Sequence, residues 1–285
     1  MSDEPSRISK LEVIDLAGLR TRSSTEVEKL LNAARSSGLF YLNLQNDVIG
    51  RQIASMLPDI YLVSENFFRQ SSDEKMKFHR AWQNPSQDRG YKQSSCDETF
   101  EMAYDEVLQK TCPLPKLMEE KIGLVDLFSK LCHSTCLTVL SSFSDVLGLL
   151  DDQRFESKHR EGETSDSGLK LISEPTLDKL SQVGDNVHTD SGTLTMLFYD
   201  LWGLEVEQPG GGEWAFTAPM MDCALFNVAD SLQRLSQNQL HSPRHRVTQP
   251  GDGAGERYYI SYFLRPEHTV PLCGKLRHEP SLQYD

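Results

Sequence analysis

The sequence predicts an α+β fold with a mainly β core, in which an N-terminal helical region packs on an antiparallel jelly roll or a related sandwich. Two patterns in the sequence carry this prediction. Apolar residues recur at helical spacing through most of the first half, whereas after a polar stretch at 161–167 short apolar segments alternate with Gly, Pro, Asp and Asn. We therefore expect one structural unit, with a helical region and flanking strands at 1–160 and the β core at 161–285.

The first expected helix covers 26–36, because positions 27, 30, 31 and 34 are apolar. Gly38 then ends it, since glycine readily adopts the left-handed conformation that closes a helix, and residues 39–42 have the composition of a strand. Further apolar patterns predict helices at about 48–68 and 116–149. The first half is therefore expected to be mostly helical.

Seven strands are expected in the second half, each bounded by turn-forming residues. They lie at 169–172, 193–199, 204–207, 214–217, 224–228, 245–248 and 257–264. A series of short strands with turn signals between them is typical of sandwiches and barrels, and the double-sheet jelly roll is one common solution. The helices would then cover one outer face of this β core.

Charge and composition exclude several classes of protein. The chain has 285 residues and a formal net charge of −13, from 29 Lys and Arg against 42 Asp and Glu, which disfavours binding to nucleic acid or anionic lipid. No segment approaches the roughly 18 unbroken apolar residues of a membrane helix, and the first residues lack the order of a secretory signal. We expect a soluble, cytoplasmic protein that binds a small molecule and neither nucleic acid nor membrane; its oligomeric state stays open.

The six cysteines show no paired spacing that would indicate a zinc site or a disulfide framework, so they are expected to be reduced. Cys132, His133 and Cys136 lie close together in the sequence. They belong to an apolar helical pattern, which favours burial in the core over a metal site.

Three residues form the pattern that carries chemistry: His188, Asp190 and, on a strand far downstream, His245. On a strand, residues i and i+2 point to the same side, so an imidazole and a carboxylate at this spacing can bind one ion, and a histidine from a neighbouring strand completes the set. Two histidines and one carboxylate on one face of an octahedral metal leave the other face open, which is the geometry of non-haem iron(II) oxygenases. The sequence therefore predicts an iron site.

The same spacing of histidine and acid occurs at His159 and Glu161, so spacing alone is weak. That pair lies in a polar segment without a strand. His188 instead precedes Gly192 and the apolar strand expected at 193–199, and this setting favours it as the metal ligand.

A cationic residue follows on the last expected strand. Arg257, Tyr259 and Ser261 share one face of that strand, since alternate residues point to the same side. The planar guanidinium of arginine suits a carboxylate, and a cosubstrate that chelates iron needs such an anchor. We expect Arg257 to hold a carboxylate rather than to form a surface salt bridge.

On these residues the sequence resembles the isopenicillin N synthase-like subfamily of iron(II)/2-oxoglutarate-dependent dioxygenases. The specific part is His-Thr-Asp-Ser-Gly at 188–192, with His-Arg-Val at 245–247 and Arg-Tyr-Tyr at 257–259. The other shared segments lie at 11–16, 37–42, 67–68, 73–76, 89–91, 194–195, 203–206, 213–214, 227–230 and 263–266. The resemblance covers most of the chain, and the order and spacing of the segments agree.

The resemblance implies a double-stranded β-helix in which His188, Asp190 and His245 hold Fe(II). It also implies 2-oxoglutarate as cosubstrate, chelating the metal through its keto-acid end with its far carboxylate on Arg257, and O2 as oxidant. Succinate and CO2 would be released as an unactivated C–H bond of a small organic molecule is oxidised, by hydroxylation, desaturation or ring closure. An amino acid or a product of secondary metabolism is the substrate class that the family favours.

Two positions depart from the family. Tyr259 stands where the family usually has serine two residues after the arginine, and Glu174 stands where it usually has tyrosine before a proline. The Tyr259 hydroxyl could replace that of serine. An inward-pointing Glu174 would repel 2-oxoglutarate unless it paired with Arg257 or a substrate ammonium group, and the alternative is a solvent-facing residue.

These departures leave alternatives open. One is a 2-oxoglutarate-independent iron oxidase, as in isopenicillin N synthase and aminocyclopropane-carboxylate oxidase, with the substrate carboxylate held near Arg257. A catalytically silent binding protein and a zinc hydrolase with the same ligands are others, and metal analysis would separate them. Asn227 and Asp230, which precede His245, are interpreted as closing a turn rather than as orienting ligands.

Substrate contacts are predicted only from family position. Aromatic residues on strands more often belong to the core than to a binding site. The predicted contacts are Arg89, Tyr91, Phe100, Tyr104, Glu174 and Phe198.

Overall fold

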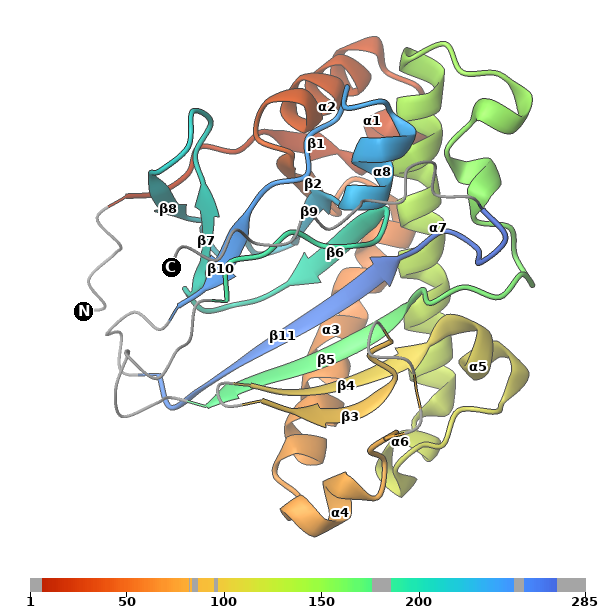
Figure 1. Ribbon diagram of the computed structural model, residues 1–285, viewed down its shortest axis with the longest axis vertical. Helices are drawn as coiled ribbons and strands as arrows, with labels where there is room; N and C mark the ends of the chain where they lie inside the picture. Colours follow the sequence, from red (N-terminus) through yellow and green to blue (C-terminus); the bar gives the residue numbers. More distant parts are fainter. Residues whose placement is uncertain are drawn as a thin grey trace, which may run out of the picture.

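The computed structural model of the chain describes residues 7–81, 83, 87–94, 97–175, 186–248 and 254–270. Two β-sheets form its centre (Figure 1). The strands of the larger sheet are β1 (Val13–Asp15), β2 (Leu39–Asn43), β3 (Gly90–Gln93), β4 (Glu98–Ala103), β5 (Gly168–Pro175), β6 (Leu194–Phe198), β9 (Cys223–Val228) and β11 (Glu256–Leu264). Those of the smaller sheet are β7 (Leu204–Glu207), β8 (Trp214–Phe216) and β10 (His245–Val247). The eight strands are ordered β1-β2-β9-β6-β11-β5-β4-β3, and the three are ordered β10-β7-β8.

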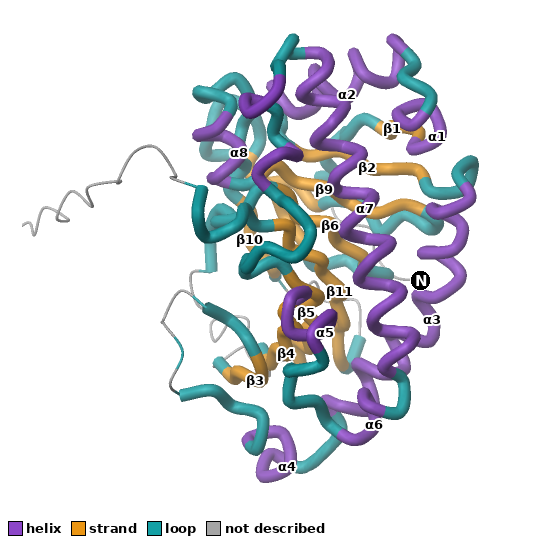
Figure 2. The backbone as a smooth tube through the Cα atoms, turned by 90° about the vertical axis from the view of Figure 1, so that its right-hand side faces the viewer, coloured by secondary structure: helices purple, strands orange, loops and turns teal. Residues whose placement is uncertain are grey.

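The helices pack mainly on one face of the larger sheet. They are α1 (Leu16–Arg20), α2 (Ser24–Ser36), α3 (Val48–Phe68), α4 (Ser72–Met76), α5 (Tyr104–Gln109), α6 (Lys116–Glu119), α7 (Ile122–Val146) and α8 (Asp230–Leu235), with short 3-10 helices at Asp151–Gln153 and Glu156–Lys158. Figure 2 shows α2, α3 and α7 together on one side of the strands, and both α3 and α7 contact β11. The predicted double-stranded β-helix with a helical region packed on it is confirmed.

Two apolar cores follow from this layering. Ile260, Tyr262 and Leu264 of β11 point into the core between sheet and helices. Tyr259, which directly precedes Ile260, points the other way into a smaller core shared by the two sheets, because side chains alternate along a strand. The face of β11 that carries Tyr259 is therefore the face turned toward the interior of the β-helix.

Most predicted elements agree with the structure. All seven predicted strands are present as β5 to β11, α3 has the predicted bounds, and Gly38 ends the segment after α2 with a φ of 71°. The predicted helix at 116–149 is instead two helices, α6 and α7. Leu117 and Leu124 both pack on the same core, so the apolar pattern continues across the break and does not reveal it.

Helix α7 has the length and the apolar composition that crossing a membrane would require, which the expectation from unbroken apolar runs did not anticipate. In the fold it contacts α2, α3, β6 and β11. Phe128, Cys132, Val139 and Phe143 along it are fully buried. The buried face of α7 accounts for part of its apolar composition, since 44% of its most apolar stretch is buried.

Candidate metal centre and cosubstrate cavity

Backbone pairing brings His188 and His245 side by side. The two residues form an isolated antiparallel bridge, with hydrogen bonds from His188 N to His245 O (3.0 Å) and from His245 N to His188 O (2.9 Å). Asp190 lies two residues further on, in the segment before β6, which begins only at Leu194. The pairing of a full strand is thus reduced to one bridge, but it still places the two histidines next to each other.

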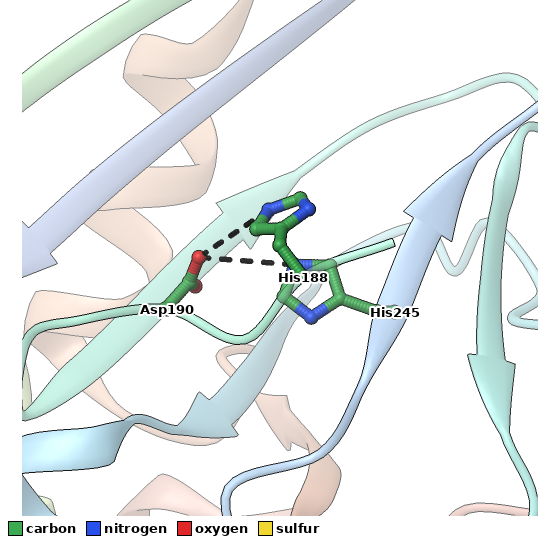
Figure 3. Close-up of side chains that lie close together, drawn as sticks. All are labelled: His188, Asp190 and His245. Carbon is green, nitrogen blue, oxygen red and sulfur yellow. Dashed lines mark ion pairs between the residues drawn. The ribbon is translucent and has the colours of Figure 1, made fainter. Parts of the chain in front are cut away.

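The three predicted ligands converge on one point (Figure 3). Nε2 of His188 and Nε2 of His245 each lie 3.7 Å from Oδ1 of Asp190, and the three ligand atoms all lie within 4.8 Å of one another. Metal–ligand bonds of about 2.0–2.2 Å allow one ion to contact such a set. The structure therefore brings together the residues that could hold a metal.

In the neutral form of each imidazole, hydrogen bonding places the proton on Nδ1 and leaves the metal-facing Nε2 with a lone pair. Nδ1 of His188 lies 2.6 Å from the backbone O of Asn186, and Nδ1 of His245 lies 3.2 Å from the backbone O of Pro243. A carbonyl oxygen only accepts, so each Nδ1 carries the hydrogen and donates it, and each Nε2 presents a lone pair. A metal ligand requires this tautomer.

Asp190 is held by its other oxygen. Oδ2 accepts hydrogen bonds from Oγ1 of Thr195 and from Nδ2 of Asn227, so Oδ1 is left to face the histidines. Burial raises the pKa of Asp190, but His245 and these two hydrogen bonds outweigh burial and hold the pKa below its ordinary value. Burial also lowers the pKa of His245. At neutral pH the set is thus a carboxylate beside a neutral imidazole, which suits a divalent cation.

The interpretation of Asn227 as a turn residue is wrong. Asn227 lies inside β9, paired with Thr195 of β6, and both side chains reach Asp190 from adjacent strands. Asp230 begins α8 and accepts hydrogen bonds from Oγ of Ser242 (2.8 Å) and Oγ1 of Thr189 (3.2 Å). Asn227 therefore orients a ligand, and Asp230 ties together the two segments that carry the ligands.

The metal set has one open side. The side chain of His188 is 52% exposed, against 11% for Asp190 and 12% for His245. Solvent reaches the set past His188, so this side offers a route of entry.

A cavity of about 320 Å³ extends from the three ligands into the β-helix. Its volume suits small molecules. Apolar side chains line one part, namely Leu39, Ile172, Leu197, Leu204 and Val247. Polar and charged side chains line the rest, together with Phe263: Asp88, Asp97, Thr99, Lys170, Glu174, Tyr259, Ser261 and Arg265.

The Tyr259 side chain lies at the wall of this cavity. Its hydroxyl is buried and has no hydrogen-bond partner among the described residues. Gly203 approaches so closely that an added Cβ would collide with this hydroxyl. A buried hydroxyl without a partner is costly, so a polar ligand at this position would satisfy it.

Arg257 lies on the same face of β11, two residues before Tyr259. It is 2% exposed, and its Nε donates to the backbone O of Trp202 (2.9 Å). Its cross-strand neighbour on β5 is Glu174, which is 9% exposed. The alternative of a solvent-facing Glu174 is thus excluded, because its side chain is buried and lines the cavity.

The other predicted substrate contacts lie elsewhere. Tyr91, Phe100 and Phe198 are buried in the core beneath the helices, on the opposite face of their strands from the cavity. Tyr104 stacks on His133, with ring centroids 4.5 Å apart, and Arg89 pairs with Asp166 and Glu106. Their predicted role gains no support from these positions. Alternation along β6 was the available signal, because it turns Thr195 and Leu197 toward the cavity.

The other two groups of potential metal ligands, around His133 and at His159, make structural contacts instead. Cys132 and Cys136 are fully buried in α7 with free thiols, and Nδ1 of His133 lies 2.8 Å from the Tyr262 hydroxyl. Both ring nitrogens of His159 have partners, the backbone O of Phe155 (3.0 Å) and Oγ1 of Thr193 (2.8 Å). Among the described residues, the trio around Asp190 is the group placed to bind a metal.

Comparisons with known proteins agree with this geometry. The model of the 2OG-Fe(II) oxygenase superfamily matches residues 165–266, and that of the non-haem dioxygenase in morphine synthesis N-terminal region matches residues 11–121. The 2-oxoglutarate-dependent dioxygenase gloE of Glarea lozoyensis is 32% identical over 268 residues, 91% of this chain and 80% of gloE. The 2-oxoglutarate-dependent dioxygenase frbH of Dothideomycetidae sp. is 32% identical over 272 residues, 92% of this chain and 84% of frbH.

Solved structures show the same fold. A full-length protein of Neurospora crassa, crystallised in complex with alpha-KG and 5-formyluracil, superimposes with a TM-score of 0.77 at 22% identity, over 94% of this chain and 88% of the Neurospora chain. AtDAO1 of Arabidopsis thaliana, a dioxygenase for auxin oxidation in complex with 2-oxoglutarate, gives a TM-score of 0.74 at 18% identity, over 92% and 94% of the two chains.

The chain belongs to the 2OG-Fe(II) oxygenase superfamily, within its isopenicillin N synthase-like group. It is an iron(II)- and 2-oxoglutarate-dependent dioxygenase, an oxidoreductase that uses Fe(II), 2-oxoglutarate and O2.

Proposed function

We propose that His188, Asp190 and His245 bind the Fe(II) through Nε2, Oδ1 and Nε2. The observation that carries this assignment is the set of hydrogen bonds behind the ligands. Both Nδ1–H groups donate to backbone carbonyls, and Oδ2 of Asp190 accepts from Thr195 and Asn227. These bonds aim three lone pairs at one point before a metal arrives, which reduces the ordering cost of binding.

For 2-oxoglutarate, the cavity between the metal ligands and Tyr259 has the right chemistry in the right order. Next to the ligands, Leu204 and Val247 provide an apolar wall that suits methylene groups. At the far end, the partnerless Tyr259 hydroxyl suits a carboxylate. Arg257 does not itself line the cavity, but its buried side chain lies directly behind this end, opposite Glu174 and two residues before Tyr259 on β11, and adds positive charge there. We assign the far carboxylate of the cosubstrate to this end.

The substrate we propose is a small metabolite of secondary metabolism, oxidised at an unactivated C–H bond in the cytoplasm. Phe263 and the cations beside it would form the substrate side of the cavity, with Nζ of Lys170 5.7 Å and Cζ of Arg265 4.7 Å from its ring centroid. Relatives support the class: their names include a proline hydroxylase of Petromyces alliaceus and a flavonoid 7-O-demethylase of Ocimum basilicum.

When bound, iron and 2-oxoglutarate would supply the oxidising power of the reaction. The reaction consumes O2 and releases succinate and CO2. The chain contributes placement. Thr195 and Asn227 fix the orientation of Asp190, Tyr259 and Arg257 orient the cosubstrate, and the apolar wall excludes water from the reacting atoms. Hydroxylation, desaturation and ring closure share the same first abstraction of hydrogen, so the bound pose of the substrate decides between them.

The test uses 2-oxoglutarate labelled at its C1 carboxylate. The iron-loaded chain should release labelled CO2, and a panel of small metabolites should contain members that accelerate the release. His245→Ala should abolish it. His241→Ala, which removes an exposed histidine four residues earlier, should leave it unchanged. Substrate oxidation that proceeds without 2-oxoglutarate would overturn the proposal in favour of a 2-oxoglutarate-independent oxidase.

A further inference from the structure

Glu174 occupies an unusual position beside the expected carboxylate anchor. It lies directly opposite Arg257 in the register of β5 and β11, is 9% exposed, and lines the cavity together with Tyr259. A buried carboxylate at this point would add a negative charge where 2-oxoglutarate brings another. The family's usual tyrosine carries an O–H donor instead.

Three charged or polar groups face Glu174. Arg257 and Tyr259 approach from β11, and Asp97 approaches from the segment before β4. Within the described residues, no carboxylate–cation contact of 4.0 Å or less neutralises Glu174. Its nearest like charge, Asp97, lies in the same cavity wall.

These surroundings favour the protonated acid. Burial raises the pKa of Glu174 to about 8, and the charge of Asp97 adds to this effect. The charge of Arg257 opposes it, as does the Tyr259 hydroxyl, which faces Glu174 without forming a regular hydrogen bond. At neutral pH the side chain is then mostly a carboxylic acid, which can donate a hydrogen bond to a carboxylate. The ionised form could only repel one.

We propose that Glu174 binds 2-oxoglutarate as a carboxylic acid, donating its O–H to the far carboxylate beside Arg257 and Tyr259, so that cosubstrate binding requires one proton on the protein. This inference rests on the proposed location of 2-oxoglutarate. It explains how the chain accepts 2-oxoglutarate despite an acid in the wall of the cosubstrate site: the acid replaces the usual tyrosine as an O–H donor.

The test is calorimetric titration of the Mn(II)-loaded chain with 2-oxoglutarate across a range of pH. The Kd should be constant below pH 7 and rise about tenfold per pH unit once Glu174 ionises. Binding above that point should take up one proton, measured from the dependence of the heat on the ionisation enthalpy of the buffer. Glu174→Gln keeps an N–H donor and cannot ionise, so it should bind with a Kd near the wild-type low-pH value at every pH.

A second ligand isolates the far carboxylate. In 2-oxopentanoate a methyl group replaces that carboxylate while the keto-acid end is unchanged, so its binding should not depend on pH in either protein. The wild-type proton count needs no variant and tests the inference even if Glu174→Gln folds poorly.

The possible failures are distinguishable. A wild-type Kd that does not change between pH 7 and 9, or a pH dependence that survives Glu174→Gln, would overturn the role of Glu174. The role of Glu174 would also be overturned if Glu174→Gln bound 2-oxoglutarate more tightly than the wild type by the same factor at every pH. That result would show that Glu174 is ionised at all of these pH values. Absence of 2-oxoglutarate binding at any pH would instead overturn the proposed location of the cosubstrate.

Discussion

Nδ2 of Asn227 donates a hydrogen bond of 2.9 Å to Oδ2 of Asp190, from a neighbouring strand of the larger sheet. This bond uses the carboxylate oxygen that does not face the two histidines. The sheet therefore sets the direction of the ligand oxygen, and strand pairing between β6 and β9 becomes part of the metal site.

Replacing Asn227 by Ala should weaken metal binding without unfolding the protein. Loss of such an orienting contact typically costs about 10–100-fold in metal affinity. Titration with Mn(II), followed by electron paramagnetic resonance, measures the Kd. Asn32→Ala, at an exposed position of α2, is the matched control and should bind metal like the wild type. Equal metal affinity in both variants would show that the hydrogen bond has no part in the site.

Gly203→Ala should weaken 2-oxoglutarate binding and leave metal binding intact. The new methyl group would collide with the Tyr259 hydroxyl and lie only 3.1 Å from the backbone O of Thr248, while Cδ of Arg257 at 3.5 Å would be in ordinary contact with it. Calorimetric Kd values for 2-oxoglutarate and for Mn(II) separate the two effects. Gly123→Ala, in α7, places its Cβ in open space and should change neither value. Unchanged 2-oxoglutarate affinity in Gly203→Ala would place the cosubstrate elsewhere.

A buried ion pair behind the cavity should contribute to stability. Glu101 is 1% exposed and pairs with Nη1 of Arg265, which also lines the cavity. Glu101→Ala would remove this partner from Arg265, whose side chain is 18% exposed. Breaking a fully buried pair typically costs about 3–5 kcal/mol in unfolding free energy, and the partial exposure of Arg265 places the expected loss at the lower end of this range. Urea denaturation measures the change. Removing the exposed partner of Lys77 by Glu74→Ala should cost less than about 1 kcal/mol. If both variants lose a similar, small amount of unfolding free energy, the ion pair of Glu101 and Arg265 does not stabilise the fold.

Two buried histidines should make the fold sensitive to acid. Burial lowers the pKa of both His133 and His159 to about 4, whereas histidine in the unfolded chain titrates near its ordinary pKa of 6.5. Between these values the unfolded chain binds more protons, so each histidine stabilises the fold above pH 6.5 and this contribution is lost as pH falls toward 4.

The expected slope is roughly 1.4 kcal/mol per pH unit for each histidine within this window. Urea denaturation at a series of pH values gives the slope. His133→Gln should reduce the slope by the contribution of one histidine. Asn32→Ala, at an exposed position of α2, changes no ionisable group and should leave the slope unchanged. A slope that is the same in the wild type and in His133→Gln would show that folding does not lower the pKa of His133.

The sequence was sufficient to predict the metal ligands because their signal is local and chemical. His188 and Asp190 are two residues apart, and His245 begins a short strand with its own flanking pattern. The strands of the second half were predictable for a similar reason, since Gly, Pro and Asn mark their ends. Residue type and spacing are properties that a single sequence displays directly.

The side of a strand that faces the cavity was harder to predict. Tyr91, Phe100 and Phe198 have the composition expected of a binding pocket, but they face the helices. Which face is covered by helices depends on packing between distant segments, such as α3 and α7 against β11. Strands β1, β3 and β4 were missed as well. β1 pairs with β2 and β4 pairs with β5, which both lie further along the chain. β3 and β4 also pair with each other as a local hairpin, which the sequence pattern did not reveal.

The role of Asn227 was missed for the same reason. Its neighbours in the sequence suggest a turn, and only the pairing of β9 with β6 places it beside Asp190. The position of Glu174 opposite Arg257 likewise depends on the register of β5 and β11.

The most direct test of the metal centre is an anaerobic titration with Fe(II) in the presence of 2-oxoglutarate, following the visible absorption that appears when a 2-oxo acid chelates ferrous iron. The wild type and His241→Ala should develop this absorption with a stoichiometric end point, whereas His188→Ala, Asp190→Ala and His245→Ala should each lose it. Failure of the wild type to take up iron, or full absorption in all three ligand variants, would contradict the assignment of these residues as the iron site.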